Sequence, residues 1–338
     1  MGQEVVTVLG AGAWGTALAT LLAHNNYRVV LWCKEAEVAE EIEEHHLNNR
    51  YLPDVRLDEA IEPTPSLQHA LAASQWVFEA IPVKFLRETL EAAHPFMRSE
   101  QIWVITSKGI EDETLLLPTA VVEDVLGSLV TTCVCAGPSF AKELAQELVT
   151  SVMIASVQHE IAKKLAGMLA TSYFFPRITD DVMGVQVGGA MKNVIALAVG
   201  IIEGAGYKEN TRAMLITQGL EEMGEIAAHF GGRHETIFGL SGVGDLVLTA
   251  MGTQSKNLRA GIMLGQGYGV EEITQLMGTL PEAFNTVKSI MKLVERTGMT
   301  LPLTMGTYEY IFEGRSARSF LERIVGRACK AKSYQLML

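Results

Sequence analysis

The feature that most constrains the fold lies at the start of the chain. An apolar, β-branched segment at residues 5–9 runs directly into the glycine-rich sequence GAGAWG at residues 10–15. A helical pattern follows at residues 16–24, and a second apolar segment follows at residues 28–32. A strand, a glycine-rich turn, a helix and a second strand in this order are typical of a Rossmann-type βαβ unit. We therefore expect an α/β fold with an N-terminal dinucleotide-binding domain.

Each glycine of this turn has its own role in binding a dinucleotide. Gly10 permits the tight turn, Gly12 lets the backbone approach a pyrophosphate, and Gly15 allows close packing of the helix on the strand. The N-terminus of the helix presents backbone N–H groups to the phosphates. The turn therefore predicts binding of NAD or NADP, and a turn that binds no ligand is the alternative.

The residues after the second strand bear on which dinucleotide is bound. Lys34 could pair with the 2′-phosphate of NADP, whereas Glu35 could bind the ribose 2′-hydroxyl of NAD. A surface lysine without a role is the alternative for Lys34. We favour the interpretation that NADP is accepted.

Polar residues and turns follow several further apolar segments. These segments predict strands at residues 76–81, 102–106, 131–136, 152–156 and 174–179. Ligands of an open parallel sheet bind outside the carboxyl ends of its strands. Those ends carry Pro82, Lys108 and the turn from Gly137 to Ser139. We therefore expect Lys108 and this turn to face the nicotinamide and the substrate.

Composition and charge narrow the function classes. The 338 residues predict about two domains, and the net charge of −12 argues against a nucleic-acid binder. A local basic pocket for an anionic substrate remains compatible with this charge. The four cysteines (Cys33, Cys133, Cys135 and Cys329) show no CxxC spacing, which favours free thiols and no metal site. Because the first strand begins near residue 4, we expect no signal peptide and a cytoplasmic protein.

From about residue 182 the pattern changes from short strands to long helical runs. The runs are residues 185–203, 211–229, 257–267, 270–277, 282–298 and 302–314. We expect the dinucleotide-binding domain to span residues 1–181 and a mostly helical, substrate-binding domain to span residues 182–338. The first run approaches the length of a membrane span, but Gln186, Lys192 and Asn193 indicate a buried core helix instead.

Lys192 lies in the middle of this apolar run. Burial disfavours the charged form of a lysine and lowers its pKa, which suits the amine for proton transfer near neutral pH. With a hydride carrier bound at the glycine-rich turn, such an amine would serve an alcohol–ketone interconversion. A structural lysine paired with a buried carboxylate is the alternative.

Two more segments of the helical half carry polar residues. Asp245 opens a short helix after the sequence GVG, and Thr249 lies four residues beyond it. Ser255, Lys256 and Asn257 precede a helical run. A hydroxyl, a cation and an amide at the start of a helix form a receptor for a phosphate group. An acidic N-cap, and a capped helix with a surface lysine, are the alternatives.

Seven sequence segments, taken in chain order, together resemble one known family over nearly the whole chain, from the first strand to about Arg327. They are GAGAWGTAL, SKGIE, GPSFAKEL, GVQVGGAMKN, LSGVGDLVLT, QSKN and MLGQG. The set resembles the bacterial-type NAD(P)-dependent glycerol-3-phosphate dehydrogenases. GPSFAKEL and GGAMKN are far more specific than the glycine-rich turn.

The resemblance implies a role for each matching residue. Lys192 would accept the proton of the glycerol C2 hydroxyl, and Lys108 would contact both cofactor and substrate. Asp245, with Thr249 and Asn193 near it, would orient the two lysines and the substrate hydroxyls. The remaining implied contacts are with the substrate for Gly137 and Ser139, with its phosphate for Ser255, Lys256 and Asn257, and with the cofactor for Gly10, Gly12, Ala13, Trp14, Gly15, Lys34, Pro82, Ala141, Lys256, Leu280 and Glu282. It further implies a homodimer without a membrane span, whose product serves phospholipid synthesis.

Two positions depart from the family, which usually has arginine where this chain has Lys34 and Lys256. Lysine keeps the charge but loses the planar fork that binds phosphate through two hydrogen bonds. The departure bears on NADP affinity more than on the substrate.

Two other functions compete with this interpretation. A related two-domain dehydrogenase acting on a hydroxy acid or a hydroxyacyl thioester would not need residues 255–257 as a phosphate receptor. A dinucleotide sensor without catalytic activity would have no use for a lysine inside the apolar helix.

Overall fold

The structure is a computed structural model that describes residues 3–332, with side chains described up to residue 326. The chain forms two compact units. The sheet unit comprises Met1–Lys108 and Leu116–Gln186, and the helical unit comprises Gly109–Leu115 and Val187–Leu338. The expected combination of a Rossmann-type sheet domain with a mostly helical domain is confirmed.

The division between the units differs from the expected one after Asp181. The boundary lies at Gln186, because the Gln186 side chain accepts a hydrogen bond from the Thr119 backbone N–H at 3.0 Å and donates to the Thr119 hydroxyl at 2.9 Å. The segment Gly109–Leu115 belongs to the helical unit, where Ser289 donates to the Ile110 carbonyl at 3.2 Å.

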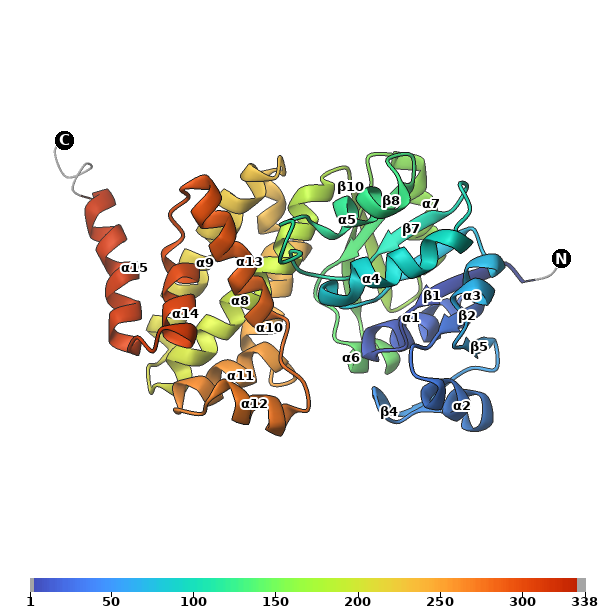
Figure 1. Ribbon diagram of the computed structural model, residues 1–338, viewed down its shortest axis with the longest axis horizontal. Coiled ribbons are helices and arrows are strands. Elements are labelled where there is room, and N and C mark those ends of the chain that lie inside the picture. Colours follow the sequence, from blue (N-terminus) through green and yellow to red (C-terminus); the bar gives the residue numbers. More distant parts are fainter. Residues whose placement is uncertain (1–2, 333–338) are drawn as a thin grey trace. The chain divides into compact units, whose positions relative to one another are not determined.

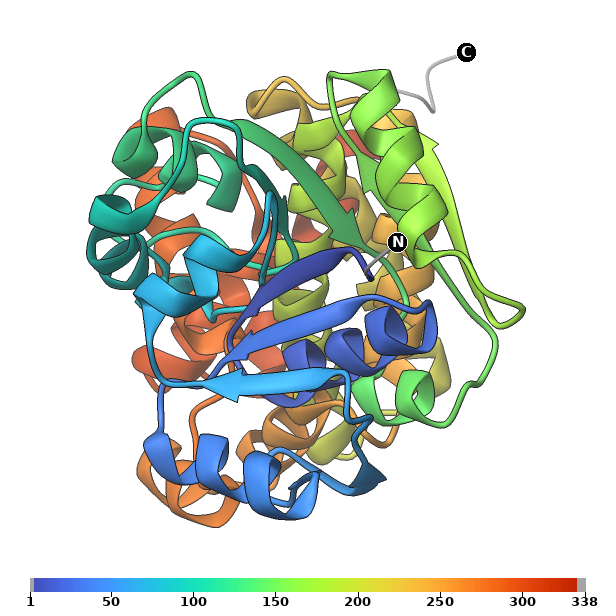
Figure 2. The same ribbon diagram turned by 90° about the vertical axis from the view of Figure 1, so that its right-hand side faces the viewer.

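Within the described residues, the sheet unit contains an eight-stranded sheet in the order β10-β9-β8-β7-β6-β1-β2-β5. Its strands are β1 (Val5–Leu9), β2 (Arg28–Trp32), β5 (Ile61–Thr64), β6 (Trp76–Glu79), β7 (Ile102–Ile105), β8 (Thr131–Ala136), β9 (Thr150–Ala155) and β10 (Phe174–Thr179). A separate hairpin pairs β3 (Leu47–Asn48) with β4 (Leu52–Arg56). Neighbouring strands are parallel except β8 and β9, which are antiparallel. Figure 2 shows β1, β2 and β5 side by side, with their arrowheads pointing the same way.

Helices cover both faces of this sheet, as its nearly continuous apolar strands require. The helices of the unit are α1 (Ala13–His24), α2 (Ala36–His45), α3 (Leu67–Ala73), α4 (Val83–Ala93), α5 (Pro118–Leu126), α6 (Ala141–Ala145) and α7 (His159–Leu169), with a 3₁₀ turn η1 (His94–Phe96) (Figure 1). Side chains of α1, α2 and α7 share one apolar core with alternate strand residues such as Val6 and Phe78. Side chains of α3, α4 and α5 share the other core with Val77 and Ile105.

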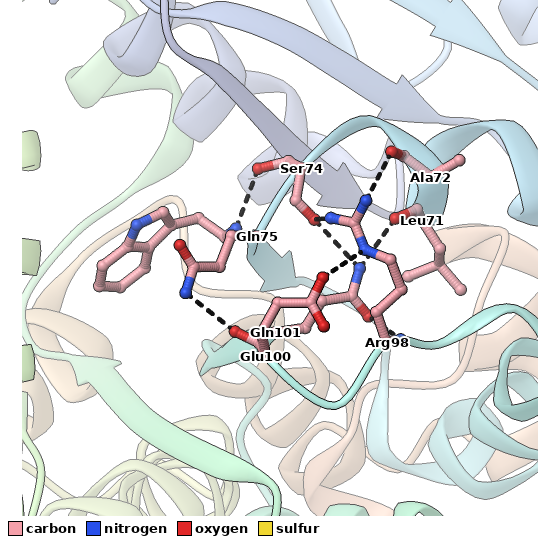
Figure 3. Close-up of polar contacts among 8 residues, drawn as sticks. Leu71, Ala72, Ser74, Gln75, Arg98, Glu100 and Gln101 are labelled. Atoms are coloured by element: carbon pink, nitrogen blue, oxygen red, sulfur yellow. Dashed lines mark hydrogen bonds and ion pairs between the residues drawn. The ribbon is translucent and has the colours of Figure 1, made fainter.

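A polar network fixes the amino ends of β6 and β7 (Figure 3). The Arg98 guanidinium donates to the carbonyls of Ala72 at 3.0 Å and Ser74 at 2.8 Å. The Gln101 side chain donates to the carbonyls of Leu71 at 2.8 Å and Ser74 at 3.0 Å. Because the network joins the end of α3 to the starts of two central strands, it stabilises the register with which these strands reach their carboxyl ends.

The helical unit is built on α8, whose first residues still belong to the sheet unit. The elements in order are α8 (Val182–Gly204), α9 (Glu209–His229), η2 (His234–Phe238), the π-helical turn η3 (Leu240–Gly244), α10 (Asp245–Met251), α11 (Lys256–Gly265), α12 (Val270–Met277), α13 (Ala283–Thr297), α14 (Pro302–Phe312) and α15 (Ala317–Lys332). Helix α8 is long and apolar enough to cross a membrane, but its apolar window is wholly buried inside the structure. It is a core helix, as predicted.

A glycine seam brings α8 and α11 into backbone contact. A Cβ on Gly261 would lie 2.3 Å from the Leu197 carbonyl oxygen, and one on Gly204 would lie 2.1 Å from that of Ile262. Real Cβ atoms essentially never approach a heavy atom within 3.0 Å, so a side chain at these positions would force the two helices apart. The seam places the first turn of α11 beside the middle of α8.

The cysteines whose side chains the structure describes, Cys33, Cys133 and Cys135, are unpaired and buried, as expected. Cys133 and Cys135 lie on one face of β8 and belong to one apolar core. Burial raises the pKa of Cys135 to about 12, although the nearby Lys108 opposes the shift. These thiols are therefore inert core residues at neutral pH. The Cys329 side chain lies outside the described part of the chain.

Candidate functional site

The glycine-rich turn has the geometry that a bound pyrophosphate requires. Gly10 has a φ of +108°, and a Cβ there would lie 2.8 Å from the Ala80 carbonyl oxygen. A Cβ on Gly15 would lie 1.9 Å from the Gly10 carbonyl oxygen, whereas one on Gly12 would have open space within 4 Å. Gly10 and Gly15 thus close the turn, and Gly12, the N-cap of α1, leaves room for a ligand at the helix N-terminus. The turn fits a dinucleotide.

A distant asparagine supports this turn. The Asn48 side chain is fully buried and donates to the Ala11 carbonyl at 2.9 Å and to the Thr16 hydroxyl at 2.8 Å. Thr16 in turn donates to the Ala11 carbonyl at 3.2 Å. The sequence marks neither Asn48 nor Thr16 as a support of the turn, since neither belongs to the glycine pattern and Asn48 lies in the short hairpin.

Charged and aromatic side chains gather beyond the carboxyl end of β2. The amino groups of Lys34 and Lys84 lie 5.1 Å and 4.5 Å from the centre of the Phe85 ring. The Glu35 carboxylate instead accepts a hydrogen bond from the Tyr51 hydroxyl at 2.9 Å. Two cations therefore flank one aromatic ring, while the acid that would favour NAD is held by a tyrosine.

Lys108 follows β7, and its amino group donates to the Gly137 carbonyl at 3.4 Å. The Ser139 hydroxyl donates to the same carbonyl at 2.9 Å. Only glycine fits at position 137, because a Cβ would lie 2.9 Å from the Cα of Val152. Pro82 is the N-cap of α4, and Ala141 is the first residue of α6. The structure thus brings Lys108 together with the turn after β8.

Lys192 and Asp245 form a buried ion pair in the helical unit. The Asp245 side chain is fully buried and that of Lys192 is 10% exposed, and the Lys192 amino group bonds directly to an Asp245 carboxylate oxygen. The Thr249 hydroxyl donates to the Asp245 carbonyl at 2.6 Å. Lys192 is therefore paired with a buried carboxylate, which is the structural alternative given above. That carboxylate belongs to Asp245, the residue that the family resemblance expects to orient Lys192.

Close backbone packing explains why the two side chains meet. Gly188 lies one turn before Lys192 on α8, and a Cβ there would lie 2.4 Å from the Ser241 carbonyl oxygen. Ser241 lies in the π-helical turn η3, one turn before Asp245. Two helical segments in contact at Gly188 and Ser241 bring their next turns, at Lys192 and Asp245, face to face. A π-helical turn at this place is a frequent mark of a functional site.

Asn193 extends this cluster to the start of α11. The Asn257 side chain donates to the Asn193 side-chain oxygen at 2.9 Å and accepts a hydrogen bond from the Ala283 backbone N–H at 3.2 Å. Ser255 is the buried N-cap of α11, and its hydroxyl oxygen accepts a hydrogen bond from the Leu258 N–H at 3.2 Å. Lys256 begins the helix and is exposed. The contacts therefore place the expected phosphate receptor next to the Lys192–Asp245 pair.

The predicted residues fall into two sets, one in each unit. The sheet unit carries the glycine-rich turn, Lys34, Pro82, Lys108, Gly137, Ser139 and Ala141, and the helical unit carries Lys192, Asn193, Asp245, Thr249, residues 255–257, Leu280 and Glu282. Glu282 is the N-cap of α13, beside the Ala283 N–H that bonds to Asn257. Among residues 3–326, whose side chains the structure describes, no group of three or more His, Cys, Asp or Glu side chains is placed to bind a metal ion.

A Rossmann-type unit with a turn that fits a dinucleotide, joined to a helical unit with a buried lysine, defines a nicotinamide-dependent dehydrogenase as the class. Profiles of the NAD-dependent glycerol-3-phosphate dehydrogenase family match the chain over both units, the N-terminal profile at residues 5–162 and the C-terminal one at residues 181–322. The chain belongs to this family, and the resemblance inferred from its motifs is confirmed.

Individual relatives agree with this assignment over nearly the full length. The chain is 38% identical over 331 residues to glycerol-3-phosphate dehydrogenase (NAD(P)+) of Carboxydothermus hydrogenoformans, covering 98% of each chain. It is 39% identical over 337 residues to the protein of the same name from Geobacillus thermodenitrificans, covering 99% of this chain and 98% of the relative. The crystal structure of glycerol-3-phosphate dehydrogenase from Coxiella burnetii superimposes with a TM-score of 0.92 at 33% identity, covering 96% of this chain and 99% of that one.

Proposed function

We propose that this chain is an NAD(P)-dependent sn-glycerol-3-phosphate dehydrogenase, which interconverts dihydroxyacetone phosphate and sn-glycerol 3-phosphate. A bound nicotinamide cofactor supplies or accepts the hydride at C2 of the substrate. The observation that carries the proposal is the buried Lys192–Asp245 pair beside the Asn193–Asn257 contact. Membership of the family and the motifs of both units support the substrate assignment.

We propose Lys192 as the general acid and base. In the reducing direction its ammonium group donates a proton to the C2 oxygen while hydride reaches C2, and in the oxidising direction the neutral amine takes that proton. Asp245 aims the amino group and compensates its charge in a buried position. The bond from Thr249 to the Asp245 carbonyl holds the first turn of α10 and therefore the carboxylate.

Lys108 is proposed as the second cation at the C2 oxygen. Its positive charge would stabilise the negative charge that develops on this oxygen during reduction. Gly137 and Ser139 line the same part of the sheet unit, and the Gly137 carbonyl holds the Lys108 amino group at 3.4 Å. In this proposal the side chain reaches both the substrate and the nicotinamide.

The substrate phosphate is assigned to Ser255, Lys256 and Asn257. Because the Ser255 oxygen already accepts a bond from Leu258, its O–H group is the part that can donate to a phosphate oxygen. Lys256 adds a positive charge at the N-terminus of α11, where the helix dipole also favours an anion. Asn193 orients Asn257 through the 2.9 Å contact between them.

The cofactor is assigned to the glycine-rich turn and to residues around it. The proposed contacts are Gly10, Gly12, Ala13, Trp14, Gly15, Lys34, Pro82, Lys108 and Ala141 in the sheet unit, and Lys256, Leu280 and Glu282 in the helical unit. NADPH use is favoured over NADH, because Lys34 offers a cation to the 2′-phosphate while Tyr51 engages the Glu35 carboxylate. We propose that residues 1–181 bind the cofactor and that residues 182–338 bind the substrate. The unit boundaries of the structure differ from this division only at residues 109–115 and 182–186.

The remaining proposals concern the cellular setting. We propose a cytoplasmic homodimer that acts on small molecules, with a product that supplies phospholipid synthesis. Burial of the apolar window of α8 is consistent with a protein that does not span a membrane. Analytical ultracentrifugation of the purified protein tests the dimer, and a sedimentation coefficient of the monomer would refute it.

Initial rates with two substrates test the proposed function. Dihydroxyacetone phosphate and unphosphorylated dihydroxyacetone are compared with NADPH and with NADH. We expect kcat/KM to be at least about 100-fold higher for the phosphorylated substrate. Charge-assisted hydrogen bonds from the phosphate receptor at residues 255–257 should contribute roughly 3 kcal/mol or more to its binding. Equal rates would overturn the assignment of residues 255–257, and turnover of a hydroxy acid or hydroxyacyl thioester instead would favour the competing dehydrogenase.

A further inference from the structure

We propose that Glu79 is a positioning residue for Lys108, holding together the loops that carry the glycine-rich turn, Pro82 and Lys108 at the carboxyl edge of the sheet. The proposal rests on the function proposed above for Lys108. It assigns a role to an acidic side chain that no motif in the sequence marks.

Glu79 occupies a central place in the sheet. It is the last residue of β6, and it pairs with Leu9 of β1 on one side and Ile105 of β7 on the other. Its side chain is fully buried. A carboxyl group in such a position costs several kcal/mol unless hydrogen bonds compensate it, so its contacts indicate what it does.

One carboxyl oxygen fixes the loop after β6. Glu79 Oε1 accepts a hydrogen bond from the Ile81 backbone N–H at 2.6 Å. Ile81 stands between Ala80, whose carbonyl packs against Gly10, and Pro82, the N-cap of α4. This contact therefore sets the backbone that closes over the glycine-rich turn.

The other oxygen fixes the residue before Lys108. Glu79 Oε2 accepts a hydrogen bond from the Ser107 hydroxyl at 2.8 Å. The Glu79 carbonyl also accepts bonds from the Thr106 N–H at 3.0 Å and the Thr106 hydroxyl at 2.7 Å. Both residues that precede Lys108 are thus anchored to Glu79, while Lys108 itself reaches the Gly137 carbonyl at 3.4 Å. Loss of the Glu79 carboxyl group would remove the contact that holds Ser107, and with it part of the anchoring of the loop that carries Lys108.

The hydrogen-bonding pattern of the Glu79 carboxyl group indicates how far a replacement keeps this arrangement. Burial raises the pKa of Glu79 to about 7, so its neutral form is well populated at neutral pH. Both Glu79 oxygens act as acceptors, because Oε2 accepts from the Ser107 backbone N–H at 3.4 Å as well as from the Ser107 hydroxyl at 2.8 Å. A glutamine amide keeps the oxygen that accepts from Ile81, but it presents N–H donors where Ser107 needs an acceptor. Glutamine should therefore keep part of the arrangement, whereas methionine, which has a similar length and no strong hydrogen-bonding group, should keep none of it.

Steady-state kinetics of three variants test the proposal, with dihydroxyacetone phosphate and NADPH as substrates. Glu79→Met is expected to lower kcat/KM by roughly 10- to 100-fold, the usual cost of losing a group that orients a functional side chain. Glu79→Gln is expected to lose less than Glu79→Met, roughly 3- to 10-fold, because the amide oxygen keeps the bond from Ile81 while the amide nitrogen cannot accept from Ser107. Ser107→Ala removes one contact only and is expected to lose roughly 3- to 10-fold, which keeps the test informative if Glu79→Met folds poorly.

A double-mutant cycle separates positioning of Lys108 from general loss of structure. In a Lys108→Ala background, Glu79→Met or Ser107→Ala should lower kcat/KM by less than about twofold further, because residues that act as a unit are not additive. An equal loss in both backgrounds, or an unchanged kcat/KM in Glu79→Met and Ser107→Ala, would overturn the proposal. An inactive wild type would instead contradict the proposed function, whatever the variants do.

Discussion

Gly261→Ala is predicted to weaken both the fold and the binding of the substrate phosphate. A Cβ at this position would lie 2.3 Å from the Leu197 carbonyl oxygen and 2.9 Å from the Cα of Gly200. To reach ordinary contact, α11 and α8 must separate by roughly 1 Å, because packed backbones have no void to absorb a methyl group. Overpacking of this kind costs about 1–3 kcal/mol of unfolding free energy.

The same displacement acts on the contact between Asn257 and Asn193. The hydrogen bond joins the two helices near their closest approach and has a length of 2.9 Å. Losing it, and with it the alignment of Asn257, costs about 1–2 kcal/mol in the complex with dihydroxyacetone phosphate. This corresponds to a KM roughly 5- to 30-fold higher.

Urea unfolding and steady-state kinetics check this prediction together. Gly167→Ala on α7 is the matched control, because a Cβ there meets nothing within 4 Å. The control should keep its KM and gain about 0.5–1 kcal/mol of stability. The KM for unphosphorylated dihydroxyacetone should not change in either variant. A Gly261→Ala protein as stable as the wild type, with the same KM for the phosphorylated substrate, would refute the role of the glycine seam.

Three further predictions follow from single side chains. Lys34→Glu should lower the NADPH/NADH ratio of kcat/KM, since it removes the cation for the 2′-phosphate, and an unchanged ratio would exclude Lys34 from cofactor choice. Burial raises the pKa of Glu222 from 4.5 to about 7, so the folded state binds this proton more tightly than the unfolded chain. The stabilisation from the protonated carboxyl group is therefore complete below about pH 4.5 and is lost as the pH rises through 7. Glu222→Gln should remove roughly 3 kcal/mol of the difference in unfolding free energy between pH 4.5 and pH 8, measured by urea unfolding. The same pH dependence of the unfolding free energy in wild type and variant would contradict the raised pKa of Glu222. Asp245→Asn should lower kcat for dihydroxyacetone phosphate reduction by about 100-fold or more with little change in the dissociation constant of NADPH, and a wild-type kcat would mean that the carboxylate does not support Lys192.

The sequence predicts the parts of the fold that carry strong periodic patterns. The strands from β1 to β10 with continuous apolar residues and the long helices from α8 to α14 follow from such runs. The edge strand β5 and strand β4 were not predicted, because each is short and contains a proline, Pro63 and Pro53 respectively. The antiparallel direction of β9 depends on tertiary packing and leaves no local pattern.

The candidate site divides in the same way. Gly10, Gly12 and Gly15, together with Lys192, are recognisable because each is chemically unusual in its segment. Asn48 and Glu79 are not recognisable, since one asparagine in a hairpin and one acid at a strand end have no spacing that marks them. Their importance comes from contacts across the fold, at 37 and 28 residues of separation from Ala11 and Ser107.

The most direct test of the account is the activity of Lys192→Ala, measured as kcat for dihydroxyacetone phosphate reduction together with the dissociation constant of NADPH. The exposed Lys163→Ala on α7 is the matched control and should behave as the wild type. Lys192→Ala should lose on the order of 100- to 10,000-fold in kcat, the usual contribution of a general acid, while binding NADPH within about twofold of the wild type. A Lys192→Ala protein that binds NADPH and keeps the wild-type kcat would contradict the central claim.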